Sequence, residues 1–346
     1  MVFNLNDFDE IRPGPWEWDA KRLLASVAVV GRANGFDGDE RERVLRTSAK
    51  AYRERMRTLA GMGELDVWYA ETAIDGALLA TVDRRYAQAI RKTATKARSR
   101  TILEELSKLT RLVDGKRRLV SDPPLIIPID VLVGKADARK HEQRMSDLMK
   151  AYQESLAPSL RGLMTRFRYA GMARKVVGVR SVGIRECAVM LLGRDDGDPL
   201  LMKVKEAQPS VLETYLGPSG YTNAAERVVE GEWLMQACGD ILLGWLRCAG
   251  PDGHEADYYV RQMRDWKGSA GVDSMTPQLL ADYGRSSGLL AGDRIAIASY
   301  LGSGDAADIT LTRFAGAYAE QNEGDYAALR AAAASNRLPR LKPGDS

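Results

Sequence analysis

The sequence contains few of the residues that build disulfides or histidine-rich metal sites. It holds three cysteines and two histidines in 346 residues, and no Cys-x-x-Cys pair occurs. An odd number of scattered cysteines argues against a disulfide framework or a zinc ribbon and favours free thiols in a reducing compartment. Two isolated histidines, His141 and His254, exclude a His-rich metal site.

Long apolar runs and leader segments are also lacking. No run of about 18 apolar residues occurs, so we expect no membrane-spanning helix and no membrane partner. The first residues do not combine a basic region with an apolar core, which argues against a signal peptide. We therefore expect a cytoplasmic globular protein, and the length of 346 residues predicts two domains or one two-lobed unit.

The formal charge of +3 conceals a strongly basic stretch. Residues 84–118 contain twelve Lys or Arg against three Asp or Glu, a local charge of +9 that leaves −6 for the rest of the chain. Such a stretch attracts phosphates, and it is also typical of a solvated helix face. Neither a helix-turn-helix nor interleaved aromatic residues accompany it, so the sequence does not favour nucleic acid as a partner.

Hydrophobic periodicity predicts an α+β protein. Helices are expected at 16–34, 38–60, most of 77–113, 136–156, 158–166, about 223–238 and much of 276–334. Strands are expected at 176–178, 187–192, 200–205, 241–247 and 258–263, with a hairpin turn at 195–198. This pattern gives a five-strand antiparallel block flanked by helical regions.

Three regions follow from this order of elements. Residues 1–166 are expected to form a mainly helical lobe with an acidic strand at its start. Residues 167–268 are expected to form a β-rich small lobe with one helix. Residues 269–346 are expected to be helical and to pack with 1–166.

Two carboxylates stand at the end of a short apolar segment near the N-terminus. Asp7 and Asp9 are two positions apart, so on an extended chain both side chains point the same way. Paired carboxylate oxygens are suitable ligands for a hard cation such as Mg²⁺. The alternative is a solvated acidic turn before Pro13.

A glycine-containing connection follows the first expected strand of the β block. Gly178, Ser181 and Gly183 lie in this connection, and glycines allow a backbone to approach a polyphosphate closely. Glycine is also the ordinary residue of turns, so the loop alone is weak support for a phosphate site.

Lysines and glutamates follow the loop in a suggestive order. Lys203 and Lys205 end a strand, and the next helix carries Glu226, Glu230 and Glu232, any of which could hold a lysine in place. A glycine loop, a strand lysine, a helix glutamate and two further strands are the small-lobe order of protein kinases. The alternative is an ordinary antiparallel sheet with solvated lysines.

In kinases the metal-binding acidic motif lies after the small lobe, whereas Asp7 and Asp9 lie before the β block. The sequence therefore predicts a two-lobed, kinase-like fold of the aminoglycoside-phosphotransferase type with its lobes permuted in sequence.

Several long segments resemble the bacterial domain of unknown function 2252 family. They are FNLNDFDEIRPGPWEWDAKR (3–22), RKVVGVRSVGIR (174–185), KVKEAQPSVL (203–212), RVVEGEWLMQ (227–236), YYVRQMRDWKGS (258–269) and AYAEQNEGD (317–325). The resemblance implies no established activity. It favours Lys205 over Lys203, because the family-like run places its lysine before Glu-Ala.

The kinase-like order of elements, rather than the family resemblance, predicts that the candidate site holds ATP and Mg²⁺. Lys205 is expected to bind phosphates with Glu230 as its partner, while Gly178, Ser181 and Gly183 line the loop. Asp7 is expected to hold Mg²⁺ with the help of Asp9. The reaction class would be a phosphotransferase acting on a small molecule or a protein.

The sequence departs from the family in two places. Family members typically carry a Gly-Asp-x-His-x-x-Asn motif, similar to a phosphotransferase catalytic loop, before the acidic strand, and this chain begins after that point. In addition, Arg180 replaces the middle glycine of the family loop. The alternative is therefore an N-terminally truncated, inactive relative that acts as a binding or regulatory protein.

Overall fold

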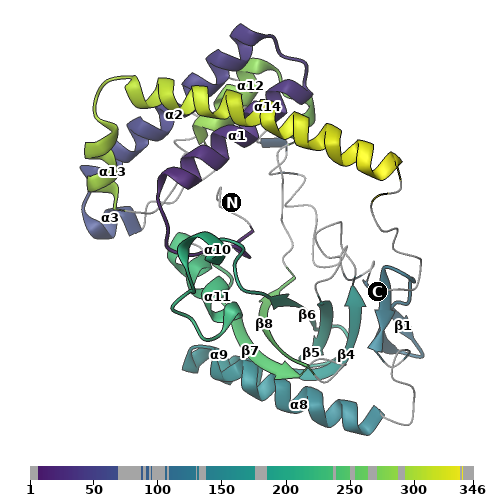
Figure 1. Ribbon diagram of the computed structural model, residues 1–346. Helices are drawn as coiled ribbons and strands as arrows, with labels where there is room; N and C mark the ends of the chain where they lie inside the picture. Colours follow the sequence, from purple (N-terminus) through teal and green to yellow (C-terminus); the bar gives the residue numbers. More distant parts are fainter. Residues whose placement is uncertain are drawn as a thin grey trace. The chain divides into compact units, whose positions relative to one another are not determined.

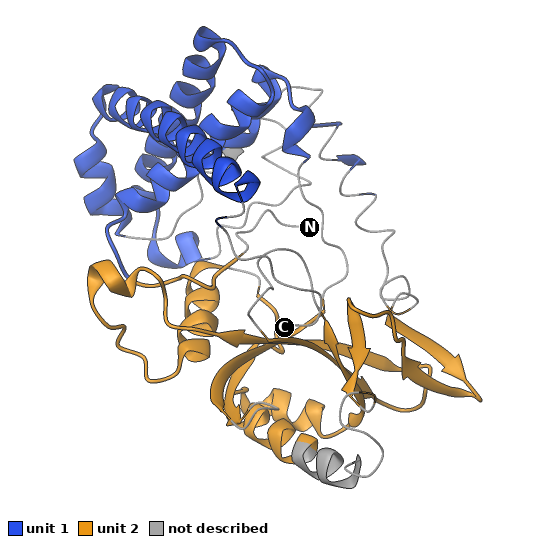
Figure 2. Cartoon of the chain, turned by 45° about the vertical axis from the view of Figure 1, so that its right-hand side comes forward, with its two compact units in different colours: residues 1–4, 13–96, 268–346 blue, residues 5–12, 97–267 orange. Residues whose placement is uncertain are grey.

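The computed structural model resolves two compact units, which Figure 2 colours separately. It describes residues 7–68, 87–88, 91–92, 95, 106, 109–129, 131, 138–175, 185–236, 239–249, 254–263, 271–286, 293–335 and 337. Unit 1 comprises residues 1–4, 13–96 and 268–346, and unit 2 comprises residues 5–12 and 97–267. These boundaries differ from the three regions that we expected, because the sheet unit takes in 5–12 and everything from 97 onward that we had assigned to the first helical lobe.

Unit 1 is helical in its described residues. Its elements are α1 (Glu17–Ala33), α2 (Gly38–Ala60), α3 (Glu64–Trp68), a 3₁₀ turn η3 (Val272–Ser274), α12 (Pro277–Ser286), α13 (Arg294–Leu301) and α14 (Ala306–Ala334). Among the described residues no helix is long and apolar enough to cross a membrane.

Local signals account for where the first helices begin and end. Asp37 accepts a hydrogen bond from the Glu40 amide while the Glu40 side chain bonds the Asp37 amide, a capping box that starts α2. Gly35 ends α1 with φ of +75°, a conformation that glycine adopts without strain. The predicted helices at 16–34 and 38–60 are confirmed to within a residue.

The core of unit 1 joins helices from both ends of the sequence. Buried Leu24, Met56, Leu280 and Ala315 belong to one apolar cluster. Helix α2 is also tied to α14 by a buried ion pair, in which Arg53 donates from Nε and Nη2 to the two oxygens of Asp308 at 2.9 and 2.8 Å. Helices α1 and α2 therefore share one core with α12 and α14.

Unit 2 is built on a six-stranded antiparallel sheet with strand order β3-β4-β5-β6-β8-β7. The strands are β3 (Ile126–Pro128), β4 (Arg168–Lys175), β5 (Glu186–Leu192), β6 (Pro199–Ala207), β7 (Gly244–Ala249) and β8 (Glu255–Gln262). A separate ribbon pairs β1 (Thr110–Val113) with β2 (Lys116–Leu119). Among its described residues, the helices of unit 2 are α8 (Ala138–Glu154), α9 (Pro158–Met164), α10 (Glu213–Leu216) and α11 (Ala224–Met235).

The two faces of the sheet are covered differently (Figure 1). Tyr152 of α8 and Met164 of α9 pack on one face with Met202 and Val260. Val228 of α11 packs on the other face with Tyr259 and Leu243. Since side chains alternate along a strand, Lys203 and Lys205 lie on the α11 side, opposite Val204, which packs with the first cluster.

Two expectations about the β region are wrong, and a third falls outside the described residues. The expected count of five strands is wrong, because the sheet has six strands in its described residues. Residues 110–113 are a strand rather than the end of a basic helix. Strand β4 ends at Lys175, and the strand expected at 176–178 lies outside the described residues. The hairpin turn at 195–198 is confirmed by the pairing of β5 with β6.

Candidate functional site

Lys205 occupies a central position on the α11 face of the sheet. Its cross-strand partners are Glu186 on β5 and Tyr259 on β8, and Tyr259 in turn pairs with Trp245 on β7. The Lys205 side chain is only 12% exposed. A lysine that is this deeply buried requires a compensating anion.

The compensating anion is the carboxylate of Asp9. Lys205 Nζ lies 2.5 Å from Asp9 Oδ2, and the Tyr259 hydroxyl donates to Asp9 Oδ1 at 3.2 Å. Both carboxylate oxygens of Asp9 are therefore engaged by side chains that project from adjacent strands. The structure thus brings together two predicted site residues that lie 196 positions apart in the sequence.

The charges around this pair hold Asp9 ionised. Burial raises the pKa of Asp9, but the hydrogen bond from Lys205, followed by those with Asp7 and Tyr259, outweighs burial and lowers the pKa below its ordinary value. Burial and the nearby Asp9 charge raise the pKa of Tyr259 well above its ordinary value, so its hydroxyl stays protonated and donates.

The segment that carries Asp9 is fixed on both sides of it. Phe8 is 8% exposed and packs into the α11 cluster. The Glu10 carbonyl accepts from Ser210 Oγ at 3.0 Å, and a Glu10 carboxylate oxygen accepts from the Val211 amide at 2.8 Å. Ile11 lies against Gly231 of α11, which has no side chain to obstruct it. We call residues 7–12 the acidic segment below.

Asp7 has a backbone conformation that few residues other than glycine adopt. Its φ is +78°, in the left-handed region. Such a conformation costs free energy and occurs often at binding sites, because the surrounding contacts must enforce it. Asp7 also forms a side-chain hydrogen bond with Asp9, so the two carboxyl groups are in contact.

We expected Glu230 to pair with Lys205, but Lys205 pairs with Asp9. Glu230 instead accepts from the Tyr221 hydroxyl at 2.8 Å. Glu232, which is 1% exposed, lies on the sheet side of α11 and pairs with Arg261 at 3.5 Å. Lys203 pairs with Glu186 at 2.9 Å.

The glycine loop and the metal ligands are the remaining parts of the predicted site. Gly178, Ser181 and Gly183 lie outside the described residues. Within the ranges that the structure describes, no group of three or more His, Cys, Asp or Glu could hold a metal ion. Asp7 and Asp9 therefore remain a two-carboxylate set.

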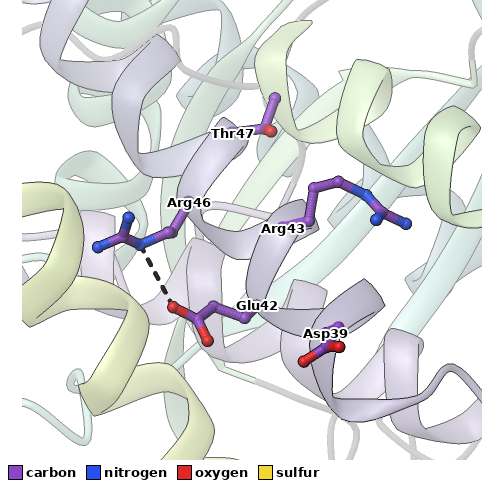
Figure 3. A pocket seen from close by; sticks show the side chains of 5 residues that line it. All are labelled: Asp39, Glu42, Arg43, Arg46 and Thr47. Atoms are coloured by element: carbon purple, nitrogen blue, oxygen red, sulfur yellow. Dashed lines mark ion pairs between the residues drawn. The ribbon is translucent and has the colours of Figure 1, made fainter.

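A shallow depression on unit 1 lies outside this site. It has a volume of ≈350 Å³ and is lined by Asp39, Glu42, Arg43, Arg46 and Thr47. All of these side chains project from α2, and Figure 3 shows the ion pair between Glu42 and Arg46 along that helix. A single helix supplies no opposing wall for a ligand, so we interpret the depression as a solvated helix surface.

Sequence reasoning missed Tyr259 and Arg227 as contributors to the site. Tyr259 lies in a predicted strand, but its place beside Lys205 depends on the pairing of β6 with β8. Arg227 lies in a segment that resembles the family, and its burial, which it shares with Arg53, depends on the fold. Its place as the one basic residue of α11, followed by Val228 and Val229, is the local signal that could have indicated it.

Comparisons with known proteins identify the family and nothing more specific. No curated protein and no solved structure matches the chain. A family model described as an uncharacterised protein conserved in bacteria, DUF2252, matches residues 1–332. Since this match covers nearly all of the 346 residues, the chain belongs to the DUF2252 family.

Proposed function

We propose that unit 2 binds a nucleoside triphosphate together with Mg²⁺, in a kinase-like manner, as the basis of a phosphotransferase activity. The observation that carries this proposal is the ion pair of Lys205 with Asp9 on the face of the sheet. In kinases a strand lysine contacts phosphates while an aspartate holds the metal ion, so both groups must face one ligand.

The order of elements supports the same interpretation. A hairpin of β5 and β6 carries Lys205, α11 follows, and β7 and β8 complete the sheet beside β6. This is the succession of lysine strand, helix and two strands that a kinase small lobe uses. The acidic segment precedes these elements in sequence, as a permuted order of lobes requires.

The residues present fit a magnesium ion that is bound jointly with phosphates. Mg²⁺ usually keeps several waters and takes one or two protein carboxylates together with phosphate oxygens. Asp7 and Asp9 supply two carboxyl groups in contact with each other. A hydrogen bond between two carboxyl groups needs a proton on one of them, and a bound cation would take the place of that proton. When bound, the metal would neutralise phosphate charge.

Thermal unfolding in the presence of Mg-ATP tests the proposal. A ligand at 100 times its Kd stabilises the folded state by about 2.7 kcal/mol, which corresponds to a rise in Tm of roughly 5–10 °C for a unit of this size. We expect this rise for the unmodified protein and none for Lys205→Met. Asp7→Asn should retain a response to ATP only at higher Mg²⁺ concentration.

Lys203→Met is the matched control. It removes a lysine from the same face of the same strand, where the partner is Glu186 rather than Asp9. Each variant is compared with its own Tm without ligand, so a change in basal stability does not affect the result. An equal response in Lys203→Met and Lys205→Met, or no response in the unmodified protein, would refute the proposal.

A further inference from the structure

Arg227 is a buried cation that binds the acidic segment through its main chain. The residue is 2% exposed. Its Nη2 donates to the Asp9 carbonyl at 2.8 Å and to the Gln208 carbonyl at 3.0 Å, and its Nη1 donates to the Ile11 carbonyl. One guanidinium therefore joins α11, the acidic segment and the chain that follows β6.

The positive charge of Arg227 is compensated differently from the charges of two other cations in unit 2. Lys205 and Arg261 each have a carboxylate within an ion pair, whereas the described hydrogen bonds of Arg227 all end on carbonyl oxygens. A buried arginine is costly unless its donors find acceptors, and both terminal nitrogens of Arg227 find them in main-chain carbonyls. Its contacts thus fix the course of the main chain.

Helix α11 contacts the acidic segment at two points on one face. Arg227 and Gly231 are four positions apart, so they lie one above the other on the helix. Arg227 binds the Ile11 carbonyl, and Gly231 accommodates the Ile11 side chain. The same arginine binds the Asp9 carbonyl, which fixes the backbone from which the Asp9 carboxylate reaches Lys205.

We propose that Arg227 is a positioning residue that directs the Asp9 carboxylate onto Lys205. Helix α11 thus acts on the lysine indirectly, through Arg227 and the acidic segment, since its own Glu230 and Glu232 bind Tyr221 and Arg261. The importance of this arrangement for a ligand rests on the proposed function. The arrangement itself can be tested in the free protein.

Site-resolved acetylation of lysines provides that test. The folded full-length chain is treated with a limiting amount of acetic anhydride, and modification of each lysine is quantified by mass spectrometry. Lys203 serves as the internal reference, because it lies on the same strand and face and is paired with Glu186. In the unmodified protein we expect Lys205 to react less than Lys203, since Lys205 is 12% exposed and Lys203 30%.

Arg227→Met should raise the reactivity of Lys205 relative to Lys203 at least threefold. Asp9→Asn should raise the same ratio, because it removes the partner of Lys205 directly. Arg227→Lys, which keeps the charge and one donor group, should recover part of the protection. This rescue distinguishes a positioning role of Arg227 from a packing role. Arg227→Lys also keeps the proposal testable if Arg227→Met does not fold.

Two results would overturn the proposal. Parallel increases at Lys203 and Lys205 would show that Arg227 only stabilises the unit. An unchanged ratio in both Arg227 variants, with a raised ratio in Asp9→Asn, would show that Asp9 keeps its position without the arginine. Because the assay uses no nucleotide, a failure of the unmodified protein to respond to Mg-ATP would leave its result unaffected.

Discussion

Replacing Gly231 by alanine places a methyl group inside the volume of Ile11. The new Cβ would lie 2.6 Å from Ile11 Cδ1 and 2.7 Å from Cγ2. Isoleucine is β-branched and stiff at χ1, so rotation cannot withdraw both atoms together. Either the acidic segment or α11 must therefore shift.

The magnitude follows from two opposing effects. Overpacking of this kind costs about 1–3 kcal/mol. Alanine in a helix interior is favoured over glycine by about 1 kcal/mol. The free energy of unfolding should therefore fall by about 0–2 kcal/mol in Gly231→Ala, given these two ranges. In an Ile11→Ala background the clash is absent, so Gly231→Ala should raise the free energy of unfolding by about 1 kcal/mol.

Denaturant unfolding of the two single variants and the double variant measures this coupling. The reference is Gly324→Ala in α14, where no atom lies within 4 Å of the added Cβ. That variant should be more stable than the unmodified protein by about 0.5–1 kcal/mol. The reasoning is refuted if Gly231→Ala stabilises the protein as much as Gly324→Ala does, or if its effect is the same with and without Ile11.

The remaining predictions concern two carboxylates. Asp308→Asn leaves Arg53 buried without its anion, so the urea midpoint of unit 1 should fall by an amount equivalent to about 3–5 kcal/mol, whereas replacing both residues by apolar ones should recover much of the loss. Asp9 has a folded pKa below its ordinary value of 3.8, so its contribution to stability is present above that value and is lost as the pH falls through the folded pKa. The Tm of the unmodified protein should therefore drop more steeply between about pH 5 and pH 2 than that of Asp9→Asn, and parallel curves would contradict this assignment.

Elements that are specified by their own residues were predictable from sequence. Helix α2 begins after the Asp37 capping box and ends before Gly61, and both signals are local. The β1-β2 ribbon was missed although its turn, Asp114-Gly115, is a strong hairpin signal, and both residues have positive φ.

Strand β4 shows why other elements could not be predicted. It contains Gly171, and its pairing with β5 shifts register between Tyr169 and Gly171. Only Ala173 of this strand is buried, so the sequence shows no alternation of apolar and polar residues. Its strand character comes from hydrogen bonds to neighbouring strands, which a local pattern does not contain.

In the candidate site, too, the sequence predicted residue types but not the contacts that depend on the fold. The residue types at Asp9 and Lys205 indicated phosphate and metal chemistry from the sequence alone. Their pairing could not be predicted, because it requires the acidic segment to dock on α11 through Phe8 and Ile11. The acids of α11 were the natural candidates because of the kinase-like order of elements, and Glu230 is instead bound by Tyr221.

The pairing of Lys205 with Asp9 has a consequence for how a ligand would bind. Both oxygens of Asp9 are engaged in the free protein, so Mg²⁺ alone must compete with a buried ammonium group. A phosphate alone would meet the negative charge of Asp9 at the same place. When both arrive together, Lys205 can turn to the phosphate while Asp9 turns to the metal, and every buried charge keeps a counter-charge. Binding of nucleotide and Mg²⁺ should therefore be cooperative, with each raising the affinity for the other by the same factor.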